Sequence, residues 1–170
     1  MNPLREASQL GQSLWLDNLS RTLLKEGTLK RLIEEDGISG VTSNPSIFHK
    51  AVSESPYYRD ELAALKASKP DAEARYEALV IPDIQAACDL LRPVYDKTGG
   101  DDGYVSLEVS PKLAANEAGT VQAALRLKQA VARDNLLIKV PATPQGLRAF
   151  EHLIGQGVSV NVTLMFSLHH

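Results

Sequence analysis

The sequence predicts an α/β fold, a parallel (β/α)8 barrel that is truncated after about the fifth strand and has a helical insertion between strands two and three. Two observations predict it. Short apolar runs typical of strands alternate with longer helical stretches, which is the pattern of parallel βα units. The strands also have one aliphatic and one polar face, whereas an open sheet covered by helices on both sides tends to be apolar on both.

Five apolar segments have the length of strands, and the segments between them carry helix signals. The expected strands are residues 14–17, 38–42, 104–109, 136–140 and 158–164. A helical stretch, residues 20–35, follows the first strand. It is expected to break near Gly27, to be capped again by Thr28 and to end at Gly37 in a left-handed cap.

The segment between the second and third strands, residues 46–100, is long and mostly helical. A proline inside a helix removes a hydrogen bond and clashes with the preceding turn, so Pro82 is expected to begin a new helix. Gly99 and Gly100 should end the segment. Capping residues and prolines predict helix starts at Asn44-Pro45, Ser55-Pro56, Pro70-Asp71 and Thr143-Pro144, and a further helix is expected at residues 120–132.

The length of 170 residues allows one domain with a sizeable core. A closed eight-stranded barrel typically needs about 250 residues. Residues 1–170 are therefore expected to form the N-terminal part of a single barrel domain, with strands one to five present and strands six to eight absent. Such a sheet has two open edges, and open edges pair readily with other chains, so self-association is expected.

Composition and charge argue against several classes of protein. A net charge of -3 gives no reason to expect a surface for nucleic acid or for anionic membranes. The chain has no apolar stretch of about 18 residues, and its first residues lack the apolar core of a signal peptide. The single cysteine, Cys88, cannot form an internal disulfide and should pack as a small hydrophobic residue. These features predict a cytoplasmic protein.

Lys139 points most directly to chemistry, because it lies inside the apolar run 136–141. Burial penalises the charged form of an amine, so a lysine here should have its pKa lowered from about 10.4 towards neutrality. A neutral amine is the nucleophile that attacks a ketone to form a Schiff base. The alternative is a lysine at a strand end that extends to water or protects a sheet edge.

Polar side chains share the face of Lys139 on the neighbouring strands, because alternate residues of a strand face opposite sides. Two further polar residues close the first two strands. The predicted group is Asp17, Asn44, Glu108, Lys139, Asn161 and Thr163. The carboxyl ends of the strands are where barrel enzymes carry their active sites, so these six side chains are expected to form one site.

Each of these residues also has a structural interpretation. Glu108 could be a solvated strand end, although beside a lysine it could transfer protons or tune the pKa of the amine. Asp17 and Asn44 could each cap the helix that follows. Asn161 and Thr163 could hydrogen-bond neighbours within the sheet. Their coincidence on one face, from five strands, favours a functional site over packing.

No metal site and no cofactor site are expected. The histidines have no spacing with cysteines or carboxylates that is typical of metal ligands. The pair Gly99-Gly100 precedes a strand, whereas a phosphate-binding glycine loop follows one.

Three segments resemble motifs of the transaldolase family. Residues 40–46, GVTSNPS, resemble its second-strand motif; residues 137–143, LIKVPAT, its Schiff-base lysine strand; and residues 160–167, VNVTLMFS, its fifth strand. Residues 15–17 and 106–109 match as well, so the resemblance covers nearly the whole chain. It implies a class I aldolase-type TIM barrel that acts on sugar phosphates in the non-oxidative pentose phosphate pathway, without metal or organic cofactor.

The resemblance also implies a role for each site residue. Lys139 would form a Schiff base with the ketone of a ketose phosphate such as sedoheptulose 7-phosphate or fructose 6-phosphate. Asp17 would take the proton of the hydroxyl beside the scissile carbon–carbon bond. Glu108, through a water held with Thr163, would move protons during Schiff-base formation. The side chains that would hold the dihydroxyacetone portion or line the pocket are Asn44, Asn161, Thr42 and Ser106.

The last three strands of the family, which supply arginines for the substrate phosphate, have no counterpart in the sequence. Three functions are therefore open. The first is a transaldolase that transfers a three-carbon unit to an aldose phosphate. The second is an inactive partial barrel that serves as an assembly or interaction module, and the third is a fructose 6-phosphate aldolase-like lyase, which differs in the fate of the enamine.

Overall fold

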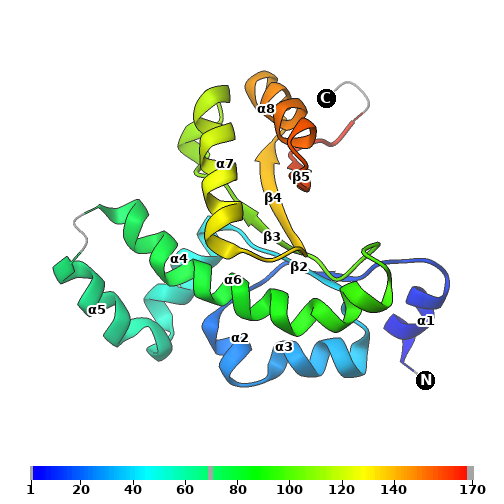
Figure 1. Cartoon of the computed structure of the whole chain (residues 1–170). Coiled ribbons are helices and arrows are strands. Elements are labelled where there is room, and N and C mark those ends of the chain that lie inside the picture. Colours follow the sequence, from blue (N-terminus) through cyan, green and yellow to red (C-terminus); the bar gives the residue numbers. More distant parts are fainter. Residues whose placement is uncertain (1, 69–70, 168–170) are drawn as a thin grey trace. The chain divides into compact units, whose positions relative to one another are not determined.

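The computed structural model describes residues 2–68 and 71–167 (Figure 1). The chain divides into two compact units, Met1–Val105 and Ser106–His170, which we call unit 1 and unit 2. Within the described ranges, no helix combines the length and the apolar character that a membrane span requires.

Helices and short strands alternate along both units. Unit 1 contains α1 (Pro3–Gln9), β1 (Trp15–Leu16), α2 (Arg21–Lys25), α3 (Thr28–Arg31), the π-helical turn η1 (Leu32–Asp36), β2 (Gly40–Thr42), α4 (Pro45–Glu54), the 3-10 turn η2 (Pro56–Tyr58), α5 (Arg59–Ser68) and α6 (Ala72–Lys97). Strand β3 (Val105–Glu108) leads from unit 1 into unit 2. Unit 2 continues with the 3-10 turn η3 (Pro111–Leu113), α7 (Glu117–Val131), β4 (Leu136–Pro141), α8 (Pro144–Gly155) and β5 (Val160–Thr163).

The strands follow one another in chain order, β1-β2-β3-β4-β5, in a five-stranded sheet. The pairs β1–β2 and β4–β5 are parallel. Sequential parallel strands joined by helices are the arrangement of a (β/α) barrel, so the predicted fold class is confirmed. Strands β1, β2, β3 and β5 are shorter than predicted, whereas β4 is one residue longer. Four helical elements, α4, η2, α5 and α6, lie between β2 and β3.

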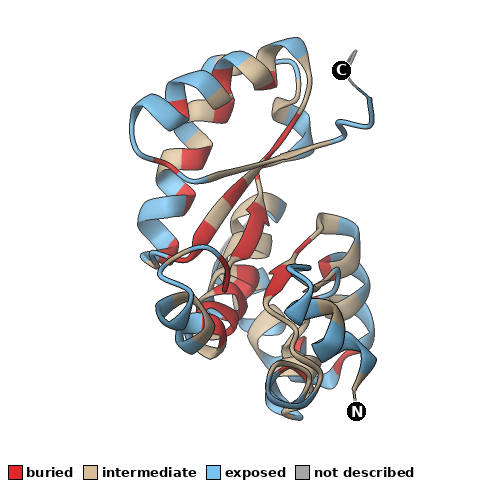
Figure 2. Cartoon of the chain, turned by 90° about the vertical axis from the view of Figure 1, so that its right-hand side faces the viewer, coloured by how far each residue is buried: buried red, intermediate tan, exposed pale blue. Residues whose placement is uncertain are grey.

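Strand β4 shows the predicted alternation of faces. Leu136, Ile138 and Val140 are buried, whereas Leu137 and Lys139 between them are only half-buried. The helices α7 and α8 pack against this strand. Most residues of β3 and β4 are buried, whereas the helices also carry exposed faces (Figure 2). The aliphatic face of β4 therefore belongs to the core of unit 2, and Lys139 belongs to the opposite face.

Most predicted helix starts are confirmed. Oxygen atoms of the N-cap side chains accept hydrogen bonds from backbone N–H groups in the first turn, which satisfies donors that have no partner within the helix. The residues that cap in this way are Asn44, Ser55, Asp71 and Thr143. Pro70 lies outside the described residues.

The predicted break at Pro82 is wrong, because α6 continues through both Pro82 and Pro93. Tertiary contacts support the helix around this proline. Asp83 and Ile84, directly after Pro82, are buried, and the carbonyl of Leu79 in the preceding turn accepts a hydrogen bond from Arg21 at 3.0 Å. A side chain from elsewhere in unit 1 thus supports the turn that proline disturbs.

Two further differences occur near the N-terminus. Thr28 is the first residue of α3 and not its cap; the cap position is taken by Gly27, whose positive φ of 73° a residue with a side chain rarely adopts. Helix α1 was not predicted. Gly37 has the expected left-handed conformation, and Cys88 is buried, as predicted.

Trp15 fixes the start of the sheet in unit 1. Its indole Nε1 donates a hydrogen bond to Asp102 Oδ1 at 3.1 Å. The ring also crosses Gly40, the residue paired with Trp15 in β2. A Cβ atom at position 40 would lie 2.3 Å from Trp15 Cε2, so this close approach requires glycine.

Candidate active site

Lys139 and Glu108 form an ion pair in unit 2. The Lys139 ammonium, in β4, lies 3.5 Å from Oε2 of Glu108, the last residue of β3. The side chains keep 12% and 17% of their exposure, so both charges are largely shielded from water. The amide of Val109 donates to the carbonyl of Lys139 at 3.2 Å, which holds the two strands together at this point.

The carboxylate of Glu108 makes fewer hydrogen bonds than a buried carboxylate usually does. Its Oε2 atom has no hydrogen-bond partner among the described residues. The 3.5 Å separation from the Lys139 amine is longer than the roughly 2.7–2.9 Å of a strong charge-assisted hydrogen bond. Buried polar atoms are normally hydrogen-bonded, so this oxygen is suited to accept a proton or a water molecule.

The neighbouring strands place polar side chains on the face of Lys139. In the parallel register Lys139 pairs with Asn161, and Pro141 pairs with Thr163. Asn161 and Thr163 are half-buried. Ser106, two residues before Glu108 on β3, is fully buried. Unit 2 therefore places amine, carboxylate, amide and hydroxyl groups on the same face of neighbouring strands.

A second polar group lies at the carboxyl ends of β1 and β2 in unit 1. Trp15 pairs with Gly40 and Leu16 with Val41, so one further step in the register sets Asp17 beside Thr42. The Thr42 hydroxyl donates a hydrogen bond to Oδ1 of Asp17. The Asp17 side chain is exposed, and Thr42 is half-buried.

The capping interpretation fails for Asp17 and holds for Asn44. Helix α2 is capped by Ser20, whose hydroxyl accepts from Leu23 N at 3.2 Å, so Asp17 has no capping role. Asn44 Oδ1 does cap α4, accepting from the amide of Ser46 at 2.9 Å and from its hydroxyl at 2.6 Å. The cap uses the Oδ1 atom of Asn44, while its Nδ2 donor takes no part in it.

A buried network in unit 1 ties the loop after β1 to the helices between β2 and β3. Arg21 donates from Nε to Asp83 Oδ1 at 2.8 Å, and its Nη1 donates to Glu61. The Tyr58 hydroxyl donates to Asp83 Oδ2 and accepts from the backbone amide of Arg21, both at 2.7 Å. The guanidinium lies 4.5 Å from the centroid of the Tyr58 ring.

This network was missed by the sequence interpretation. Its members are far apart along the chain, and no local pattern links Arg21 with a carboxylate 62 residues later. One signal in the sequence could have indicated the network: the acidic residue Asp83 lies next to apolar positions of a helix, where a buried carboxylate needs a partner. Burial raises the pKa of Asp83 above its ordinary value, although Tyr58 and Arg21 oppose the shift. Burial and the bond to Asp83 also raise the pKa of the Tyr58 hydroxyl.

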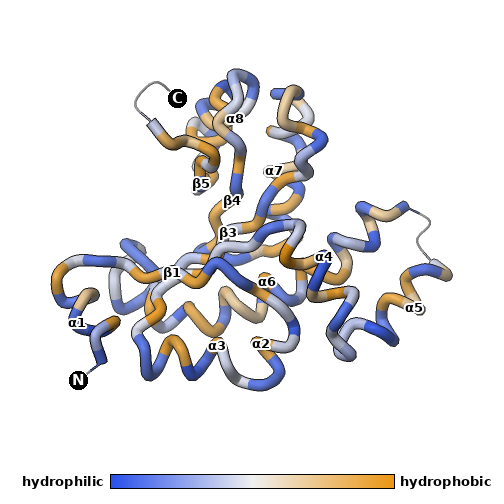
Figure 3. Tube along the Cα trace, turned by 180° about the vertical axis from the view of Figure 1, so that it is seen from behind, coloured by the Kyte–Doolittle hydropathy of each residue, from blue (hydrophilic) through white to orange (hydrophobic). Residues whose placement is uncertain are grey.

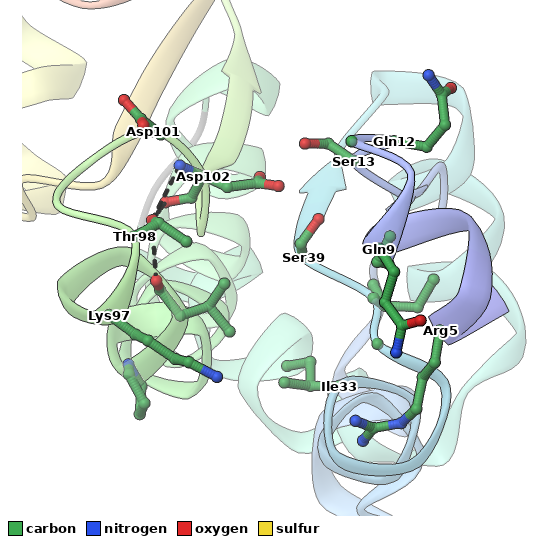
Figure 4. A pocket seen from close by; sticks show the side chains of 16 residues that line it. Arg5, Gln9, Gln12, Ser13, Ile33, Ser39, Lys97, Thr98, Asp101 and Asp102 are labelled. Carbon is green, nitrogen blue, oxygen red and sulfur yellow. Dashed lines mark hydrogen bonds between the residues drawn. The ribbon is translucent and has the colours of Figure 1, made fainter. Parts of the chain in front are cut away.

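A groove of about 790 Å³ in unit 1 is separate from these groups (Figure 4). It is lined by residues that precede β1, β2 and β3, among them Ser13, Ser39 and Asp102. It thus lies at the amino ends of the strands, whereas Asp17 and Thr42 lie at the carboxyl ends. In barrels the amino ends contribute to stability and the carboxyl ends to chemistry.

Among the described residues, no group of three or more histidine, cysteine, aspartate or glutamate side chains is placed to hold a metal ion. The polar groups near Lys139 and Asp17 are instead an amine, carboxylates, amides and hydroxyls. Such groups can form a Schiff base and move protons.

Comparison with known proteins assigns a family. A family model described as Transaldolase/Fructose-6-phosphate aldolase matches residues 14–170. A transaldolase of Thiobacillus denitrificans is 60% identical over 168 residues, which are 99% of this chain and 47% of the relative. Transaldolases of Neisseria gonorrhoeae and Trichodesmium erythraeum are 49% and 48% identical, over 98% of this chain and 47% and 44% of their own lengths. The chain therefore spans about half the length of these relatives, and it belongs to the transaldolase/fructose-6-phosphate aldolase family.

Proposed function

We propose that this chain carries the Schiff-base chemistry of a transaldolase, with Lys139 as the nucleophile. The observation that supports the proposal most strongly is the Lys139 amine itself. It is largely shielded from water, lies 3.5 Å from a buried carboxylate oxygen of Glu108 and pairs across the sheet with Asn161. Family membership and the names of the relatives support the reaction type.

The proposed reaction starts on the ketone of a ketose phosphate. The Lys139 nitrogen attacks the C2 carbonyl, and the carbinolamine loses water to give an iminium ion. Glu108, with a water held by Thr163, supplies and removes the protons of this step. Asn44 and Asn161 hold the hydroxyl groups of the dihydroxyacetone portion, and Ser106 belongs to the same group of side chains.

Cleavage then breaks the bond between C3 and C4. Asp17 accepts the proton of the C4 hydroxyl, the aldose leaves as an aldehyde, and the bonding electrons move into the iminium to give an enamine on Lys139. The enamine attacks an acceptor aldose phosphate, and hydrolysis releases the new ketose. The proposed pathway is the non-oxidative pentose phosphate pathway, in the cytoplasm, and residues 1–170 would be the first part of the barrel domain.

Borohydride trapping tests this proposal. Protein is incubated with fructose 6-phosphate, reduced, and analysed by intact mass and peptide mapping. We expect a covalent three-carbon adduct on Lys139. The variant Lys139→Met should lose the adduct, and Lys112→Met, which alters an exposed lysine of the same unit, should keep it. A folded sample, checked by circular dichroism, that forms no adduct on Lys139 would overturn the proposal.

The family description also names an aldolase, and this favours a lyase as a second candidate. The two candidates differ in the fate of the enamine. Adding erythrose 4-phosphate as acceptor distinguishes them, because a transaldolase forms sedoheptulose 7-phosphate and a lyase releases dihydroxyacetone whether or not the acceptor is present.

Exposed apolar residues favour assembly as a third candidate. Strand β5 is last in the strand order, and the chain just after it is coloured as hydrophobic (Figure 3). Leu164, Met165 and Phe166 in this segment are 60%, 50% and 80% exposed. A second copy of the chain could cover this surface. Sedimentation velocity would reveal self-association, and Phe166→Ser should weaken it if these residues form the contact. A concentration-independent monomer would rule this candidate out.

A further inference from the structure

We propose that Thr42 is a positioning residue that fixes the carboxylate of Asp17 for carbon–carbon bond cleavage. The inference rests on the proposed function, in which Asp17 accepts a proton. It gives Thr42 a different role from direct contact with the substrate.

The register of β1 and β2 brings the two side chains together. Trp15–Gly40 and Leu16–Val41 are paired, so Asp17 and Thr42 are the next residues in step at the carboxyl ends of both strands. The Thr42 hydroxyl donates to Oδ1 of Asp17. That bond leaves the second carboxylate oxygen as the atom that can meet a substrate hydroxyl.

The surroundings explain why Asp17 needs a support of this kind. Its side chain is exposed and has no part in capping α2, which Ser20 caps. The backbone before it is paired with β2 through Trp15 and Leu16, and the residues after it are anchored as well. Leu19 is fully buried, and Arg21 is bound to Tyr58 and Asp83. The side chain of Asp17 is therefore an exposed group on an anchored loop, and the hydrogen bond from Thr42 restricts its direction.

Thr42 is a suitable residue for this role. A β-branched side chain has few rotamers in a strand, so its hydroxyl keeps one direction. A hydroxyl also donates a hydrogen bond to an ionised carboxylate, and such charge-assisted bonds are stronger than neutral ones. Thr42 thereby holds the carboxylate of Asp17 in one direction.

The test separates Schiff-base formation from cleavage. Protein is mixed with fructose 6-phosphate and reduced with borohydride after increasing times. A six-carbon adduct on Lys139 reports the Schiff base, and a three-carbon adduct reports cleavage. The variants are Thr42→Val, which keeps the shape of the side chain without the hydroxyl, and Thr42→Ser, which restores the hydroxyl.

We expect Thr42→Val to form the six-carbon adduct at the wild-type rate and sugar concentration. Its conversion to the three-carbon adduct should be about 10-fold slower, the size of effect expected for one lost hydrogen bond to a charged group. Thr42→Ser should recover most of the rate. Asp17→Asn should show the same accumulation of the six-carbon adduct, more strongly.

Three results would contradict the inference or its basis. Equal cleavage rates in Thr42→Val and wild type would overturn the positioning role and leave the proposed function intact. A higher sugar concentration needed for the six-carbon adduct would show that Thr42 contacts the substrate, which also overturns it. No adduct of either kind in folded wild-type protein would instead overturn the proposed function.

Discussion

Two shielded ion pairs of this protein differ in how completely their carboxylates are hydrogen-bonded. In unit 1, Arg21 and Asp83 are 11% and 4% exposed, and both groups are hydrogen-bonded on several sides. In unit 2, Lys139 and Glu108 are almost as well shielded, but their atoms are 3.5 Å apart and Glu108 Oε2 accepts no hydrogen bond from the described residues.

The difference separates a structural pair from the pair that we propose to be reactive. A buried charge is expensive unless its hydrogen bonds are made, and Arg21–Asp83 meets this condition. Glu108 does not meet it, because its Oε2 atom accepts no hydrogen bond from the described residues, and this oxygen can bind a proton or a water molecule. The two cations are about equally buried and Glu108 is more exposed than Asp83, but hydrogen bonding distinguishes the pairs more clearly than burial does.

The largest expected effect is on the rate of adduct formation, when the pair of Lys139 and Glu108 is altered. Glu108→Gln keeps the shape of the side chain and removes its ability to move a proton. We expect the rate of adduct formation on Lys139 to fall by about 10²- to 10⁴-fold, the usual contribution of a general acid or base. The control is Glu117→Gln, which changes a glutamate of the same unit that pairs with Arg148 at the surface. A rate within twofold of wild type would remove Glu108 from the mechanism.

The structural pair should respond in stability. Asp83→Ala leaves Arg21 buried without its main partner and should lower the free energy of unfolding by about 3–5 kcal/mol. Trp15, the single tryptophan, lies in unit 1 and reports unfolding by fluorescence in urea. The matched control is Asp96→Ala on the same helix, which breaks an exposed pair with Arg92 and should cost no more than about 1 kcal/mol. Equal losses in the two variants would show that burial of the pair has no energetic importance.

A smaller effect is expected from Tyr58→Phe. The change removes the hydroxyl that links Arg21 N to Asp83 Oδ2 and keeps the ring under the guanidinium. Leaving buried groups without a partner should cost about 1–3 kcal/mol. Urea unfolding followed by Trp15 measures it. An unchanged midpoint would mean that water replaces the hydroxyl.

The smallest effect is a dependence on pH. Burial raises the pKa of Asp83 in the folded protein above its ordinary value of 3.8. The folded state then holds this proton at pH values where the unfolded chain has released it, so the contribution of Asp83 to stability is full below 3.8 and falls as pH rises through the folded pKa. The stability of wild type relative to Asp83→Asn should therefore decrease with rising pH over that window. The opposite slope would show that Arg21 outweighs burial.

Much of the fold could be predicted because its signals are local. Capping residues such as Thr143 act within one turn, and the alternation in β4 depends on neighbouring residues alone. The break predicted at Pro82 failed because a distant side chain, Arg21, supports that part of the helix. Local rules describe what a residue prefers, and a contact across unit 1 decided otherwise.

The candidate site also combines features that local signals predict with features that depend on distant contacts. The parity of the strands predicted that Glu108, Lys139 and Asn161 share a face, since parity depends only on position along each strand. The bond from Thr42 to Asp17 needs the register between β1 and β2, which the sequence does not encode locally. The roles assigned to these residues stay predictions until the adduct experiments are done.

The contact between Trp15 and Gly40 has a practical consequence for anyone who alters this protein. Position 40 has no room for even one methyl group beside the indole of Trp15. It can therefore be substituted only if Trp15 is replaced by a smaller residue at the same time. A mutant library should therefore vary the two sites as a couple. Indole emission would then report whether the first two strands still touch in each clone.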